Sequence, residues 1–149
     1  MLVKKINRLW PANQQDDKIY KVYGLTFLRN ENHTLHFLEE VDERNTWDKS
    51  KFDGGVLIED EDFAGLGYHP LSRFEVIDPH PDCRWVMQYV RSMQYDANSV
   101  PGGDVDNDVD SYWGWIYIYP GIPENILNSF VFWYDASRRL KQYIDENFP

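Results

Sequence analysis

The sequence predicts an α+β protein, with a small antiparallel β-sheet or partly open barrel in its first half and a strand followed by two helices at its end. Short segments with strand-like alternation, separated by turn-forming residues, fill residues 18–77. Hydrophobic residues then recur at helical spacing after Pro123. A run of strands followed by a pair of helices is an α+β layout.

The strands predicted in the first half alternate apolar and polar residues or form a short apolar run: 18–23 and, past a bulge at Gly24, 25–28, then 34–41, 56–58 and 74–77. Residues 29–32 have the composition of a hairpin turn. Gly65, Gly67 and Pro70 predict an irregular loop. The first sixteen residues show no clear periodicity, and Pro11 breaks any helix there.

A module boundary is predicted at residues 78–82, because two prolines there disfavour the continuation of either a helix or a strand. It divides the chain into a β-rich module, residues 1–78, and an α+β module, residues 79–149, which can pack as one unit. Residues 85–95 fit either a strand or a short helix. Residues 112–119 predict a strand with its aromatic residues on one face.

Two helices are predicted to close the chain. Pro123 suits the first position of a helix, Glu124 suits its positive end, and helical spacing continues to Tyr134. The second helix is predicted to begin near Asp135 or Ser137, either of which can cap it. Its inner face is predicted to carry Leu140, Tyr143 and Ile144.

Four motifs follow one another in the last third of the chain: Tyr117-Ile118-Tyr119, Ile122-Pro123, Ser137, and an aromatic helix that ends at Phe148-Pro149. In this order they resemble the KTSC domain, a small family named for its occurrence at the C-terminus of some lysyl-tRNA synthetases. The resemblance implies an α+β module that occurs alone or as an appendage, with a role in binding. The family often has glycine after the serine, where this chain has Arg138-Arg139.

Three motifs of the first half are Tyr20-Lys21-Val22-Tyr23-Gly24, the strand end Ile58-Glu59-Asp60, and Tyr68-His69-Pro70 leading to Phe74. Together they resemble those of small SH3-like barrel modules. The resemblance implies an SH3-like barrel for the N-terminal module.

The charge of the chain is strongly negative, with 25 acidic and 15 basic residues and a formal net charge of −10. A field of this sign repels nucleic acid and anionic membranes and favours a basic protein partner. Phe, Trp and Tyr make up 16% of the residues, and Tyr and Trp are common anchors of protein interfaces. The expected partner is therefore a basic protein, with no direct nucleic acid and no membrane.

A cytoplasmic location is expected. The single cysteine, Cys83, excludes an internal disulfide framework and a cysteine-rich zinc site. The first residues do not have the apolar run of a secretory signal, and no stretch has the length and hydrophobicity of a membrane span.

Two acidic segments are the candidate partner-binding sites. The first consists of Asp104, Asp106, Asp108 and Asp110, followed by the aromatic residues Tyr112 and Trp113. The second consists of Glu59, Asp60, Glu61 and Asp62. Acidic loops of this kind can be ordinary solvated surface, or can meet the arginines of a basic partner. The first segment is not an EF-hand, because Val109 and Trp115 occupy the positions that need Gly and Glu.

No catalytic residue, metal ligand or cofactor is predicted. His33 and His36 are three positions apart in a predicted strand, so their side chains would point to opposite faces. His69 and His80 stand beside prolines and are predicted to be loop residues. No phosphate-binding glycine loop or nucleophile motif is present.

These features together predict a non-enzymatic acidic protein that inhibits a basic partner, such as the immunity or antitoxin protein of a toxin or nuclease. Three alternatives stay open. A phage or plasmid anti-defence protein would use its acids to mimic nucleic acid. A metal-dependent hydrolase would use the segment 104–110. An RNA-binding accessory module would need a local basic patch.

Overall fold

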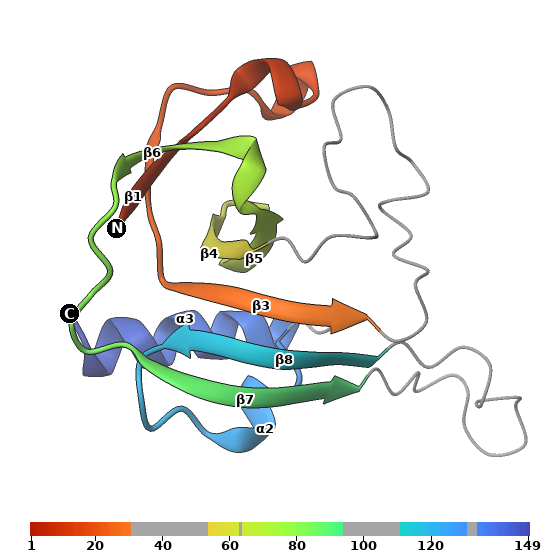
Figure 1. Cartoon of the computed structure of the whole chain (residues 1–149), viewed down its shortest axis with the longest axis vertical. Helices are drawn as coiled ribbons and strands as arrows, with labels where there is room; N and C mark the ends of the chain where they lie inside the picture. Colours follow the sequence, from red (N-terminus) through yellow and green to blue (C-terminus); the bar gives the residue numbers. More distant parts are fainter. Residues whose placement is uncertain (31–53, 63, 94–110, 131–133) are drawn as a thin grey trace, which may run out of the picture.

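The computed structural model describes residues 1–30, 54–62, 64–93, 111–130 and 134–149. It is an α+β structure with two antiparallel sheets and two helices near the C-terminus, as the sequence predicts (Figure 1). The strand predicted at 34–41 and His33, His36, Asp104, Asp106, Asp108 and Asp110 lie outside the described residues.

The larger sheet has five strands in the order β5-β4-β3-β8-β7. Their bounds are β3 Gly24–Asn30, β4 Gly55–Asp60, β5 Gly65–Pro70, β7 Val86–Met93 and β8 Ser111–Ile118. β3, β4 and β5 come from the predicted first module, and β7 and β8 come from the second. The two halves of the chain therefore share one sheet, while the boundary at residue 78 stays a prediction.

The smaller sheet has three strands in the order β2-β1-β6, with bounds β1 Leu2–Lys5, β2 Ile19–Lys21 and β6 Phe74–Asp78. Three short 3-10 helices lie beside it: η1 Asn7–Leu9, η2 Ala12–Gln14 and η3 Leu71–Arg73. The five-stranded order begins and ends with edge strands, so the described strands do not confirm the predicted small barrel.

Two helices follow β8: α2 Glu124–Leu127 and α3 Tyr134–Asn147. In Figure 1, α3 lies behind β3 and β8, so it covers one face of the five-stranded sheet. The buried side of that sheet carries Ile116 and Ile118, which are fully buried, and α3 contributes the fully buried Leu140 and Ile144. These residues form part of one hydrophobic core.

Several boundaries differ from the predicted ones. The predicted strand at 18–28 is two strands in different sheets, and Val22 and Tyr23 carry the chain from one to the other. The predicted loop at Gly65–Pro70 is β5, where glycine and a terminal proline are tolerated because β5 is an edge strand. β1 was not predicted. Residues 85–95, left open between strand and helix, contain the strand β7.

The first helix ends earlier than predicted, and the second begins next to Asp135, as predicted, but without the predicted cap. The first is a single turn that ends at Leu127, well short of Tyr134. The second begins at Tyr134, so neither Asp135 nor Ser137 caps it: Asp135 is in the first turn, and Ser137 is inside the helix with a buried side chain. The Ser137 hydroxyl instead accepts a hydrogen bond from the Leu66 N–H (2.8 Å) and donates one to the Leu66 carbonyl (2.5 Å).

Candidate functional site

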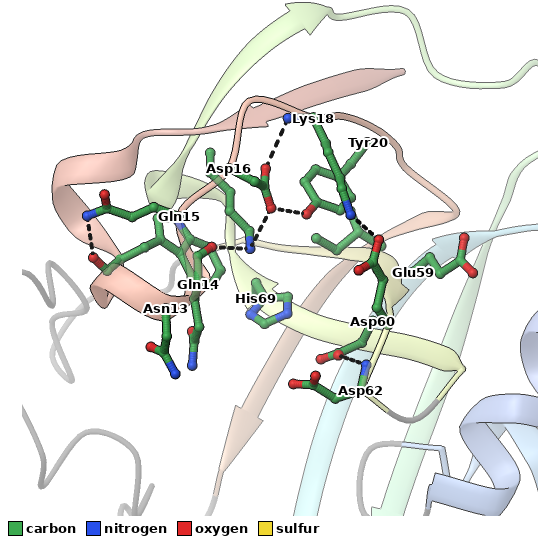
Figure 2. Close-up of a pocket in the computed structure, with 14 residues that line it drawn as sticks. Asn13, Gln14, Gln15, Asp16, Lys18, Tyr20, Glu59, Asp60, Asp62 and His69 are labelled. Atoms are coloured by element: carbon green, nitrogen blue, oxygen red, sulfur yellow. Dashed lines mark hydrogen bonds and ion pairs between the residues drawn. The ribbon is translucent and has the colours of Figure 1, made fainter.

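A polar pocket of about 340 Å³ opens between the small N-terminal sheet and the β4-β5 hairpin (Figure 2). Residues from β1, β2, β4, β5, the segment between β1 and β2, and the β4-β5 turn line it: Lys5, Trp10, Asn13, Gln14, Gln15, Asp16, Lys18, Tyr20, Ile58, Glu59, Asp60, Glu61, Asp62 and His69. Five of these side chains are carboxylates and two are lysines, so the pocket is acidic.

One wall of the pocket is a hydrogen-bonded network around Asp16 (Figure 2). The Tyr20 hydroxyl donates to Asp16 Oδ2 (2.5 Å), and Lys5 Nζ lies 3.2 Å from the same oxygen. Burial raises the pKa of Asp16, but the hydrogen bonds from Tyr20, the Lys18 N–H and Lys5 outweigh it, and the pKa is lowered overall. Burial and the Asp16 carboxylate raise the pKa of Tyr20. Asp16 is therefore ionised and already paired.

His69 is partly buried and lines the pocket, where its ring packs against Trp10 and Phe74 at centroid distances of 5.2 and 6.2 Å. Burial, with smaller contributions from the positive charges of Lys5 and Arg73, lowers the pKa of His69 to about 4. The imidazole is therefore neutral at neutral pH. Within the described residues no hydrogen bond to the ring occurs.

Gly67 lies beside this imidazole. A Cβ at Gly67 would lie 2.8 Å from His69 Nε2 and 3.2 Å from Asp60 Oδ2. The imidazole nitrogen and the carboxylate oxygen therefore pack closely over the Gly67 backbone and leave no room for a side chain there. His69 is thus a strand residue of β5 that faces a pocket, and its prediction as a loop residue was wrong.

The side chains of the predicted acidic run at residues 59–62 point in different directions, because successive side chains of β4 lie on opposite faces. Glu59 is 3.8 Å from Lys141 Nζ of α3, so it points toward the helix side. Glu61 pairs with Lys18. Asp60 Oδ1 accepts a hydrogen bond from the Asp62 N–H (3.0 Å), and Figure 2 shows both carboxyl groups on the same side of the turn. Within the described part of the chain, neither Asp60 nor Asp62 has a cationic partner.

The second candidate surface is the side of β3, β8 and β7 that faces away from α3, called here the aromatic face. It consists of Leu25, Phe27, Met87, Tyr89, Arg91, Trp113, Trp115 and Tyr117, as the strand register shows. Met87, Tyr89 and Trp115 are 51%, 57% and 50% exposed, and the rings of Tyr89 and Trp115 meet edge to face at 5.6 Å. The predicted alternation of β8 is confirmed: Gly114, Ile116 and Ile118 are buried on the opposite side.

Those residues of the two predicted segments that the structure describes lie on different surfaces. Trp113 is half-buried on the aromatic face, and Tyr112 is its neighbour in β8, whereas Asp60 and Asp62 line the pocket beside β2 and β5. Tyr119, predicted on the same face as Trp113, follows the end of β8 and is fully buried, with its hydroxyl donating to Asp82 (2.9 Å).

The sequence did not predict the pocket itself. Asp16, Tyr20 and His69 come from a loop, a strand of one sheet and a strand of the other, so no local motif joins them. The sequence contained one signal for part of the pocket. Ile19 and Tyr20 are adjacent in a predicted strand, so their side chains point to opposite faces, and Ile19 is the exposed one of the two.

In comparisons with known proteins, no family model, curated protein or solved structure matches the chain. The KTSC-like and SH3-like resemblances therefore stay predictions. Within the described residues, no helix is long and apolar enough to cross a membrane. The same residues contain no group of three or more His, Cys, Asp or Glu side chains that could hold a metal ion, and Cys83 is exposed as a free thiol.

The lowered pKa of His69 predicts a specific loss of stability in mild acid. An unfolded chain takes up a proton on this residue near pH 6.5, whereas the folded chain does so only near pH 4. The unfolded state therefore binds more protons in this interval, and the free energy of unfolding falls as the pH drops through it, by up to about 3 kcal/mol. His69→Gln should remove this part of the loss.

Urea unfolding at about pH 7 and about pH 4.5 measures the effect. His80→Gln is the matched control, because His80 is exposed and contacts Asp78 outside the pocket. The control should keep the part of the loss that comes from His69. An equal loss in His69→Gln would mean that His69 is not held neutral by burial.

Proposed function

We propose that this protein binds a basic protein partner and blocks its activity, as an immunity or antitoxin protein does. The observation that carries the proposal is the aromatic face. Exposed Tyr, Trp and Met are unusual on a sheet unless something covers them, and aromatic residues, Met and Arg are enriched in the buried centres of protein interfaces. Trp115, Tyr89 and Met87 have this composition, and Arg91 is exposed beside them.

The distribution of charge supports the same proposal. None of the residues of β3, β7 and β8 is acidic, although the chain has 25 acidic residues. Interface centres are depleted in Asp and Glu, because a buried unpaired carboxylate is costly. The whole chain has a net charge of −10, and all of its acidic residues lie outside these three strands. This charge would attract a basic partner over a distance and speed its association.

The predicted acidic segment, residues 104–110, is joined directly to a strand of the aromatic face. Asp110 is bonded to Ser111, the first residue of β8, and Trp113 follows two residues later. Carboxylates tethered to the end of an aromatic strand can pair with arginines at the rim of an interface centred on that strand. The acidic segment and the aromatic face would then bind the same partner.

Replacing the two exposed rings should abolish partner binding without unfolding the sheet. The double variant Trp115→Thr/Tyr89→Thr removes both rings, and threonine keeps the preference of these positions for strand. An aromatic hot spot of an interface contributes about 2 kcal/mol or more, so the loss of even one such ring should lower the affinity about 30-fold. Ile19→Thr, at a 59% exposed strand position of the other sheet, is the matched control.

The measurement is a pull-down from a nuclease-treated lysate at about 0.1 M and about 1 M NaCl, where the screening length falls from about 10 Å to about 3 Å. The natural protein and Ile19→Thr should retain the same basic protein at low salt, and the double variant should not. Expression of that protein alone should inhibit growth, and co-expression should relieve the inhibition. A captured protein that binds all three variants equally, or whose activity is unaffected, contradicts the proposal.

An RNA-binding role is a second candidate, because exposed aromatic side chains on a sheet can stack on unpaired bases and Arg91 lies on the same face. The net charge opposes it. A fluorescent single-stranded RNA decides between the two: binding that Trp115→Thr/Tyr89→Thr abolishes would favour the RNA role, and an absence of binding at low salt would exclude this face as an RNA platform.

A further inference from the structure

The two edges of the five-stranded sheet differ in how their backbone groups are satisfied. At one edge, the Ser137 hydroxyl of α3 bonds both the N–H and the carbonyl of Leu66 in β5. At the other edge, β7 pairs with β8 along its whole length, and within the described residues no backbone hydrogen bond leaves its outer side (Figure 1). Unpaired N–H and C=O groups on such an edge favour pairing with another strand.

β7 also lacks the residues that usually keep edge strands from pairing. Its eight residues, Val86–Met93, include no proline, no lysine and no acidic residue. Proline and inserted charges are the common protection of an exposed edge. Val86, Met87 and Tyr89 are instead large hydrophobic residues that are exposed on this strand. β7 is therefore a long edge strand with apolar side chains and little protection.

The single charge of β7 suits a second copy of the same strand. Arg91 is the only charged residue of β7, and it lies on the same side as Tyr89, two positions away. When two β7 strands pair antiparallel about a two-fold axis at Val90, Tyr89 of each copy lies opposite Arg91 of the other copy. Opposite Cβ atoms are then about 4.5–5.5 Å apart, so each guanidinium can stack on the facing ring. The symmetry forms this contact twice.

We propose that two copies of this protein pair through their β7 strands and form one continuous antiparallel sheet, with Tyr89 of each copy against Arg91 of the other. The backbone groups of the two open edges then satisfy each other. The aromatic faces of the two copies lie on the same side of this sheet, because the two-fold axis is perpendicular to it.

The exposed area indicates a weak dimer. The exposed 57% of Tyr89 amounts to about 100 Å², because a Tyr side chain buries about 150–250 Å² when it is enclosed. Met87 and Val86 are smaller and less exposed, so they add less. Two copies would bury about 500 Å² of side-chain surface, which is below the roughly 1,200 Å² at which specific stable interfaces begin. The dimer should therefore be reversible and form only in concentrated solution.

Sedimentation equilibrium of the natural protein from about 10 µM to about 1 mM should show a reversible equilibrium between monomer and dimer. Each copy has a net charge of −10, so the copies repel one another, and salt should strengthen the dimer by screening this repulsion. The dissociation constant should fall several-fold between about 0.01 M and about 0.15 M NaCl, where the screening length falls from about 30 Å to about 8 Å.

Arg91→Gln removes the cation from both contacts and should weaken the dimer about tenfold. Arg91→Lys keeps a cation and should recover most of that loss. Arg138→Gln is the matched control, because Arg138 is exposed on α3 and its replacement changes the net charge by the same amount. It should change the dissociation constant far less than Arg91→Gln does.

Amide hydrogen exchange of the natural protein locates the interface without any substitution. Amides of β7 should exchange more slowly at about 1 mM than at about 10 µM, because the second copy bonds the open edge. Amides of β2, an edge strand of the other sheet, should exchange equally at both concentrations.

A protein that stays monomeric up to about 1 mM would overturn the proposal. Two further results would also do so: equal weakening by Arg91→Gln and Arg138→Gln, and slower exchange at strands other than β7 alone. The inference goes beyond the function proposed above and does not rest on it. The two are separable, because salt should strengthen this dimer but release a basic partner.

Discussion

Gly114→Ala is expected to lower the free energy of unfolding by about 4 kcal/mol or more, although it adds a single methyl group. Gly114 has φ +148°, a backbone conformation that L-residues rarely adopt, and a Cβ there would lie 2.2 Å from the Phe27 carbonyl oxygen. That oxygen belongs to the backbone of β3, so it cannot rotate away as a side chain would. The collision must push β8 and β3 apart.

The position of β8 makes this displacement expensive. β8 lies between β3 and β7, and its Gly114 pairs with Leu28 on one side and Val90 on the other, both of which are buried. Separating β8 from β3 breaks backbone hydrogen bonds and opens the core beneath them. The variant should therefore be largely unfolded or insoluble at room temperature, because a single domain has only about 5–15 kcal/mol of stability.

Urea unfolding of Gly114→Ala and Gly54→Ala measures the effect against a matched control. A Cβ at Gly54 meets the Phe27 ring at 3.5 Å and the Thr26 carbonyl oxygen at 3.9 Å, both of which are ordinary van der Waals contacts. Gly54→Ala should stay within about 1 kcal/mol of the natural protein. If Gly114→Ala is equally mild, then β8 does not approach β3 at Phe27 as closely as the structure has it.

The sequence predicted those parts of the fold that depend on one repeated local pattern. In β8 the alternation of Trp113, Trp115 and Tyr117 with Gly114 and Ile116 is complete, so the strand and its two faces were both predicted. The same logic predicted the inner face of α3 through Leu140 and Ile144. Alternation in a strand and helical spacing in a helix both indicate which side of the element is buried.

The same patterns do not tell which strand pairs with which. Alternation through Tyr20 continues past Gly24, yet β2 and β3 belong to different sheets. β1 is only four residues long and ends in two lysines, so its burial of Val3 leaves almost no periodic signal. β5 contains two glycines and ends in proline, and its strand character depends on pairing with β4 along its whole length.

Only part of the candidate site was predicted, because the sequence does not show which strands pair. The sequence identified Asp60 and Asp62 as unusual because they belong to a dense acidic run. It could not identify His69 as their neighbour, because nothing near His69 in the chain indicates that β5 folds back beside Asp60. The pairing of β4 with β5, in which Asp60 lies opposite Gly65 and Ile58 opposite Gly67, supplies that information.

Ser137→Ala is expected to destabilise the protein by about 3 kcal/mol, although it removes one oxygen atom from a helix. The Ser137 side chain is almost completely buried, and its hydroxyl bonds both the N–H and the carbonyl of Leu66. β5 is an edge strand, so alternate backbone groups point away from β4 and need another partner. Without the hydroxyl, two buried backbone groups lose their hydrogen bonds at once.

Ser129→Ala is the control that separates this effect from the loss of any serine hydroxyl. Ser129 bonds the Asn125 carbonyl one turn earlier at an exposed site, so its replacement should cost less than about 1 kcal/mol. Ser137→Cys keeps a weak donor and acceptor at the same place and should recover part of the loss. If Ser137→Ala is as mild as Ser129→Ala, water reaches the Leu66 backbone and α3 does not seal the edge of β5. A loss of about 3 kcal/mol would show that the Ser137 hydroxyl satisfies the backbone groups at the free edge of β5. The same bonds would then help to hold in place the strand that carries His69 into the pocket.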